Sequence, residues 1–165
     1  MPEKVRLVND PILRKVCEPV NLNIISVQGL LDLMEETMKA ENGIGLAANQ
    51  IGHSYMVFIL KNEDSYQAYC NPEILSQDEL VDFEGEGCLS IPGAMATTKR
   101  YRKLTLSWQD QHGVSMQADF QDMKAFAVQH EMDHLHGKLY IDQFGPIKKD
   151  VILRKHNKFL RESRR

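Results

Sequence analysis

The sequence has no long hydrophobic run, and it has few cysteines. No apolar stretch in the 165 residues approaches the roughly 20 that cross a bilayer, so we expect no membrane partner. The N-terminus is followed by charged residues and not by an apolar segment, which argues against a signal peptide and predicts a cytoplasmic protein. The three cysteines cannot all pair within one chain, and that location disfavours disulfides. At least one thiol is therefore free for other chemistry.

The length is typical of a globular domain, and the charge is unevenly distributed along the chain. A chain of this size is long enough for one substantial core, so we expect a single domain, residues 1–165. The overall net charge of −3 conceals an asymmetry, because residues 147–165 carry eight Lys/Arg and two Asp/Glu, which is +6. The remaining residues carry −9, so the basic character belongs to the C-terminal segment.

Hydrophobic spacing predicts three helices. The first runs from Ser26, its expected N-cap, to about Glu41, with Gly43 just beyond its end. The second opens at Gln121 and Asp122. The third is a basic amphipathic helix that begins after Gly145, and an N-terminal and a C-terminal helix therefore flank the middle one.

Alternation of apolar and polar residues predicts antiparallel strands between these helices. We expect one hairpin over 55–70, with Asn71 and Pro72 ending its second strand, and another over 104–120. The acidic residues 78–86 are interpreted as a solvated edge, and a short strand is expected at 139–141. The predicted class is α+β, with antiparallel sheets packed around the middle helix.

The segment His130-Glu131-Met132-Asp133-His134 carries the clearest chemical pattern. Residues at i and i+4 share a helix face, so His130 and His134 can present ring nitrogens to one metal ion. Glu131 lies beside that face and can reach a water bound to the metal, which is the role of glutamate in HExxH metallohydrolases. Such a pair of histidines also occurs by chance on solvated helices, so the pattern needs a third ligand.

Cys88 is the best candidate for that ligand. A catalytic site of this type needs three protein ligands and an open position, and Cys88 lies beside Gly87 in a turn that could bring a thiolate close to the metal. The alternative is that Cys88 is a small buried hydrophobe. Downstream candidates have no supporting pattern (His136, Asp142, His156 and Glu162). A thiolate with two imidazoles would accept Fe(II), Ni(II), Co(II) or Zn(II).

A third segment, Gly43-Ile44-Gly45-Leu46-Ala47-Ala48-Asn49-Gln50, interrupts the helical pattern with two glycines. It could be only the exit from the first helix. Its functional interpretation is a close-packed loop in which backbone approaches a ligand and Gln50 supplies an amide donor.

Taken together, these segments resemble the peptide deformylase family. Residues 43–50 match its first motif, Glu86-Gly87-Cys88-Leu89-Ser90 its second and residues 130–135 its third, in family order and spacing. The Asn-Asp-Pro-Ile-Leu-Arg segment at 9–14 and the arginines at 100–102 are also similar, so the resemblance spans nearly the whole chain. It implies removal of formate from N-formylmethionine on new polypeptides, with Fe(II) as the native metal.

The resemblance also implies roles for individual residues. Glu131 would take the proton of the attacking water and deliver it to the departing amine. The Gln50 amide and the Leu89 backbone N–H would stabilise the tetrahedral oxyanion together with the metal. An apolar pocket for the methionine side chain would be lined by five residues: Ile44, Gly45, Met123, Phe126 and Ala127. Only Lys99 or Arg100 could supply a basic group for the rest of the substrate chain.

Three alternatives remain open from the sequence. An HExxH peptidase would cut internal amide bonds, but such enzymes usually take their third ligand after the motif. A non-catalytic module would normally close all four metal positions with protein ligands, and no fourth is evident. The basic helix is either a packed helix with a solvated surface or, as the resemblance implies for some bacterial deformylases, a segment that docks on ribosomal RNA.

Overall fold

A computed structural model describes residues 1–165 and shows an α+β fold with one five-stranded antiparallel sheet. The predicted class is confirmed, although a single sheet takes the place of several. Its strands follow each other in the order β1-β2-β3-β4-β5. The strands and helices are β1 (Gly45–Ala47), β2 (Val57–Asn62), β3 (Ser65–Glu86), β4 (Ala96–Gln109), β5 (Ser115–Gln121), α1 (Gln28–Ala40), α2 (Met123–Leu135) and α3 (Pro146–Ser163), with short 3-10 helices η1 (Pro11–Arg14), η2 (Ala48–Ile51) and η3 (Tyr140–Gln143).

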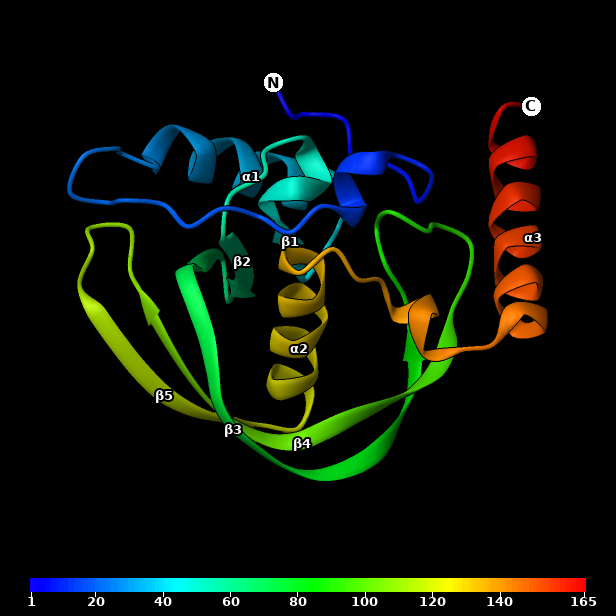
Figure 1. The fold of residues 1–165 in the computed structure, drawn as a ribbon. Helices are drawn as coiled ribbons and strands as arrows, with labels where there is room; N and C mark the ends of the chain where they lie inside the picture. Colours follow the sequence, from blue (N-terminus) through cyan, green and yellow to red (C-terminus); the bar gives the residue numbers. More distant parts are fainter.

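Strands β3 and β4 form a long curved ribbon that sweeps beneath α2 (Figure 1). The expected strand end at Asn71 and Pro72 is wrong, because β3 continues to Glu86. Asn71 instead has a positive φ of 49°, beside a register shift between Cys70 and Glu73. A bulge of this kind bends a strand without ending it. Four of the acidic residues that we expected at a solvated edge are exposed, namely Asp78, Glu79, Asp82 and Glu84, whereas Glu86 is buried.

Alternate residues of β2 face two different parts of the core. Phe58 and Leu60 pack with residues of α2, whereas Val57 and Ile59 pack with residues of α1. Successive side chains of a strand point to opposite faces, so β2 is covered on both sides. This arrangement fixes β1, which pairs with β2 through Leu46 and Ile59, between the two helices.

Helix α1 falls within the predicted range but begins at Gln28, with Val27 and not Ser26 as its N-cap. Its buried side chains include Leu31, Met34 and Met38. These residues follow the apolar spacing that predicted the helix, so the interface with the sheet explains why the segment is helical.

The C-terminal part departs from the sequence prediction at one place. Residues 139–141 do not form a strand, because η3 begins at Tyr140. Helix α3 follows and packs by Ile152 and His156, which are buried. The His156 Nδ1 atom lies 2.8 Å from the Pro92 carbonyl oxygen. Gly93 lies so close to Phe159 of α3 that no larger residue fits there. No helix in the structure is both long and apolar enough to cross a membrane.

Asp142 joins η1, η3 and α3. Its carboxylate accepts hydrogen bonds from Arg14 Nη1 at 2.7 Å and from the Leu139 N–H at 3.0 Å, with Lys149 Nζ at 3.8 Å. Partial burial acts to raise the pKa of Asp142, but these hydrogen bonds outweigh it and lower the pKa below its usual value.

We expect Asp142→Asn to lower the free energy of unfolding at neutral pH by up to about 1 kcal/mol, the range for partly exposed ion pairs. A carboxylate with a lowered folded-state pKa stabilises above its unfolded pKa of about 3.9, and this contribution disappears as the pH falls through the folded-state value. Denaturant titrations should therefore show the two proteins converging below about pH 4. Asp150→Asn, whose exposed carboxylate pairs only with Arg154 on the same helix, is the control. A difference that persists in strong acid would contradict this assignment.

Candidate active site

Three side chains converge at the end of β3 and the C-terminal half of α2. Cys88 follows β3, whereas His130 and His134 lie one turn apart on α2, and one atom of each lies within 4.8 Å of the others. His134 Nε2 is 3.2 Å from His130 Nε2 and 3.4 Å from the Cys88 sulfur. The structure therefore brings together the three residues that the sequence proposes as metal ligands.

The chemistry of this donor set fits a divalent metal ion. His130 Nδ1 lies 3.1 Å from the Glu86 carboxylate, so it bears the proton and Nε2 presents its lone pair to the shared point. Burial and the neighbouring His130 lower the pKa of His134 and favour its neutral, metal-binding form. A soft thiolate with two imidazoles suits Fe, Co, Ni or Zn, and three protein ligands leave a position free for chemistry.

A buried carboxylate positions this cluster. Glu86, at the end of β3, accepts hydrogen bonds from Arg100 Nε at 2.7 Å and Nη2 at 2.6 Å, and one from Thr98 at 2.9 Å. Arg100 Nη1 also donates to Asp133 at 2.7 Å. Burial acts to raise the pKa of Glu86, but Arg100 and His130 lower it to about 2. Glu86 is consequently ionised whenever the protein is folded at neutral pH.

The sequence analysis missed this network, and the structure corrects its expectation for Arg100. Arg100 is 4% exposed and its guanidinium is used by Glu86 and Asp133, so it cannot meet a substrate chain. Lys99 is exposed and pairs with Asp82. Neither residue lines the cavity at the cluster. Arg100 lies in a charged segment, which suggested a surface residue. Its acidic partner Glu86 lies 14 residues away in the sequence, so local spacing gave no sign that the two form a buried pair.

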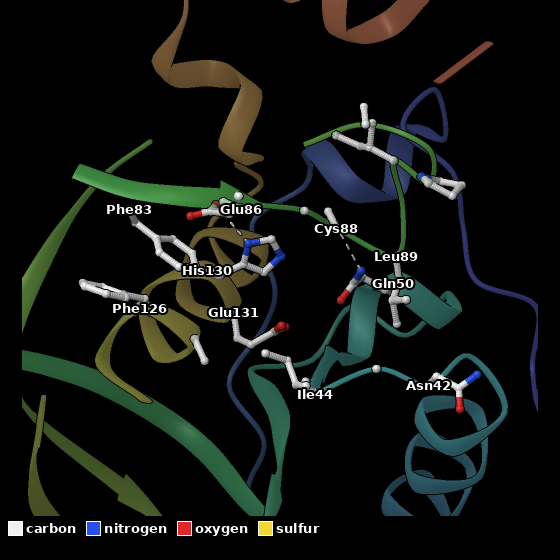
Figure 2. A pocket seen from close by; sticks show the side chains of 18 of the residues that line it. Asn42, Ile44, Gln50, Phe83, Glu86, Cys88, Leu89, Phe126, His130 and Glu131 are labelled. Carbon is white, nitrogen blue, oxygen red and sulfur yellow. Dashed lines mark hydrogen bonds and ion pairs between the residues drawn. The ribbon is translucent and has the colours of Figure 1, made fainter. Parts of the chain in front are cut away.

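Glu131 lies next to the cluster with its carboxylate toward the cavity (Figure 2). Burial raises its pKa to about 7, against the opposing effect of His130. One carboxylate oxygen, Oε2, has no hydrogen-bond partner in the protein. A Cβ at Gly45 would lie 3.0 Å from the other oxygen and 2.9 Å from Leu60, so only glycine lets β1 approach this closely.

Gln50 and Leu89 line the same cavity beside the cluster. Gln50 Oε1 accepts from the Ala47 N–H at 3.0 Å, which turns the amide NH2 toward Ser90 Oγ at 3.1 Å and the Cys88 sulfur at 3.7 Å. The Leu89 N–H donates to no acceptor in the protein. The Leu89 N–H is therefore an unused donor beside the proposed ligands, whereas the Gln50 amide is already oriented there by Ser90, a residue that was not predicted.

A cavity of about 370 Å³ opens beside these groups. All five residues predicted for a substrate pocket line it: Ile44, Gly45, Met123, Phe126 and Ala127. Phe83 of β3 also lines it and stacks on Phe126, with 4.7 Å between ring centroids (Figure 2). The sequence analysis missed Phe83 because it lies within the acidic residues 78–86. The cavity is thus apolar at one end and is lined at the other by Glu131, Gln50, Cys88 and His130, whereas His134 does not line it.

Known proteins are similar to this chain in sequence. The family model described as Polypeptide deformylase matches residues 2–150. The peptide deformylase of Pseudothermotoga lettingae is 36% identical over all of this chain and 96% of its own length, and that of Bartonella henselae is 38% identical over 94% and 92%.

Solved structures of peptide deformylases have the same fold as this chain. A peptide deformylase crystal structure from Legionella pneumophila has a TM-score of 0.94 at 36% identity and covers 100% of this chain and 99% of its own. One from Synechococcus elongatus, in complex with actinonin, has a TM-score of 0.87 at 29% identity and covers 94% and 86%. Because the likeness extends over the whole chain in both sequence and fold, this protein belongs to the peptide deformylase family.

Proposed function

We propose that this protein hydrolyses the formyl group from N-formylmethionine at the start of newly made polypeptides. Water is consumed, the bond between the formyl carbon and the nitrogen breaks, and formate and a free amino terminus are released. The observation that carries the proposal is the three-ligand cluster of Cys88, His130 and His134 with buried Glu131 at the end of an apolar cavity. Family membership favours this reaction over an HExxH peptidase or a non-catalytic module.

Cys88, His130 and His134 would hold one divalent metal ion. Such an ion supplies Lewis acidity and lowers the pKa of a coordinated water to near neutrality. We propose Fe(II) as the native ion, with Zn(II), Ni(II) and Co(II) as alternatives that the same donor set accepts. His130 is oriented for this role by Glu86, and His134 by its place one turn later on α2.

Glu131 transfers the protons in this scheme. Its carboxylate takes a proton from the attacking water and later delivers it to the departing nitrogen. A group that must accept and then release a proton works best with a pKa near the operating pH, and burial raises that of Glu131 to about 7. The unpartnered Oε2 leaves the carboxylate free to accept this proton.

Gln50 and Leu89 stabilise negative charge on the substrate oxygen. Attack on the formyl carbon places this charge on a tetrahedral oxyanion, and preorganised N–H donors lower its energy in a site shielded from water. The Gln50 amide is held by Ala47 and Ser90 before the substrate arrives, and the Leu89 N–H has no competing acceptor.

The methionine side chain fits the apolar end of the cavity. Ile44, Gly45, Met123, Phe126 and Ala127 would line this pocket, and Phe83 adds a second ring behind Phe126. Its volume of about 370 Å³ accommodates one unbranched side chain and the adjoining backbone.

We further propose that residues 1–165 act as one domain organised around α2, in the cytoplasm, where polypeptides are made. Helix α3 would dock this domain on the ribosome. Its inner side chains, Ile152 and His156, are buried, whereas several basic residues form no ion pair and are exposed: Lys155, Arg161, Arg164 and Arg165. A cationic helix face is the surface that polyanionic RNA attracts.

The role of Glu131 predicts that Glu131→Gln keeps its metal but turns over at least about 100-fold more slowly, because the amide cannot act as a base. Metal content and formate release from formyl-Met-Ala-Ser, both measured without oxygen, test this. Unchanged turnover would remove Glu131 from the mechanism. Loss of the metal would show that Glu131 is a ligand instead.

The role of Cys88 predicts that Cys88→Ser loses metal and activity together, because serine is a much poorer ligand for a soft divalent ion. Cys17→Ser and Cys70→Ser are matched controls, since both thiols are buried in the core away from the cluster. Metal analysis after dialysis should separate Cys88→Ser from the other two. A loss confined to Cys17→Ser would overturn the proposed ligand set.

Docking through α3 predicts that a Lys155→Gln, Arg161→Gln, Arg164→Gln triple variant binds ribosomes more weakly. The slope of log affinity against log salt should fall by about 3, roughly one for each lost phosphate contact. Lys99→Gln, Arg102→Gln, Lys103→Gln is the control, because it removes the same charge from residues of β4 that already form ion pairs. Equal affinities in a sedimentation assay, with equal turnover of a short formyl peptide, would exclude the docking role.

A further inference from the structure

We propose that Asn49 is a positioning residue that holds the Gln50 amide in place relative to the metal-binding helix. This inference rests on the proposed function, because it concerns the alignment of groups within that site. Asn49 precedes Gln50 on η2 and is fully buried, at 0% exposure. It does not line the cavity, so it acts on the site through its neighbours.

The side chain of Asn49 links η2 to α2. Its Nδ2 donates to the backbone carbonyl of His134 at 2.7 Å, across 85 residues of sequence. This carbonyl belongs to the last turn of α2 and also accepts a hydrogen bond from the Gly137 N–H at 3.1 Å. Asn49 therefore adds a second, long-range hydrogen bond that fixes the backbone of a proposed metal ligand relative to η2.

The other end of the Asn49 amide has no comparable partner. A carbonyl oxygen only accepts hydrogen bonds, so the NH2 group must face His134 and Oδ1 must point away from it. Oδ1 is buried and accepts no hydrogen bond from the protein. An unpaired buried amide oxygen costs stability, and a leucine, which has the same number of side-chain heavy atoms but no polar ones, would avoid that cost. What asparagine adds at this position is the bond to His134.

That bond completes the attachment of η2 on both sides. On one side, Gln50 Nε2 donates to Ser90 and lies near the Cys88 sulfur. On the other, Asn49 reaches His134. Without Asn49, η2 remains attached to the segment with Cys88 but can shift relative to α2. Such a shift would misplace the Gln50 amide in the transition state, while the apolar cavity that binds methionine stays unchanged.

The test is Asn49→Leu in the cobalt-loaded full-length protein. We expect kcat to fall by about 10- to 100-fold, the effect of removing a group that orients metal ligands, with KM unchanged. The visible absorption of Co(II) should also change, because it depends on the geometry of the ligands. Asn49→Ala, which removes the same donor without adding bulk, must change kcat and the spectrum in the same direction.

Asn71→Ala is the matched control. Asn71 Nδ2 donates to the Val20 carbonyl at 2.7 Å, the same kind of bond, but outside the site. This variant should lose stability and keep the wild-type spectrum and kcat. Wild-type spectra and kcat in whichever Asn49 variant folds would overturn the inference. The proposed function is tested separately, by formate release and by a thiolate-to-cobalt absorption band in the wild-type protein. If the wild-type protein shows neither, the proposed function fails, whatever the Asn49 variants do.

Discussion

The structure of the site depends on the buried carboxylate of Glu86. An ionised carboxylate in the interior is tolerated only when its oxygens are paired, and Glu86 meets this condition with Arg100, Thr98 and His130. These partners come from two elements, since Arg100 and Thr98 lie on β4 and His130 lies on α2. The same group therefore joins the ends of the long strands to the helix and selects which nitrogen of His130 is free to bind a metal.

The curved sheet gives these side chains their common location. Strand β3 carries Phe83 and Glu86 to the cavity and leads directly into Cys88, while β1 passes close to Glu131 because Gly45 has no side chain. Helix α2 lies in the hollow of the sheet (Figure 1). Its two histidines contact Glu86, at the end of β3, and Cys88, which follows that strand. The sheet and α2 together bury Glu131, and this burial raises its pKa because a carboxylate shielded from water is harder to ionise.

The sequence predicted features that depend on neighbours along the chain. Apolar spacing located α1 and α2, alternation located the hairpins, and the spacing of His130 and His134 predicted a shared helix face. It could not predict contacts between distant segments, such as Glu86 with His130 at 44 residues or Asn49 with His134 at 85. Nor could it show that β3 bends at Asn71 and continues, because a turn signal and a bulge signal use the same residue types. Phe83 was missed for this reason, whereas Arg100 was wrongly expected to meet the substrate because its partner Glu86 lies 14 residues away in the sequence.

The identity of the ligands is the point on which the metal chemistry depends. X-ray absorption at the zinc edge of the zinc-loaded protein measures it directly, because sulfur and nitrogen ligands differ in distance, at about 2.3 Å and 2.0–2.1 Å. Cys88, His130 and His134 predict one sulfur and two imidazole nitrogens, with a light atom from solvent in the remaining position. A shell with no sulfur, or with two, would contradict the proposed site.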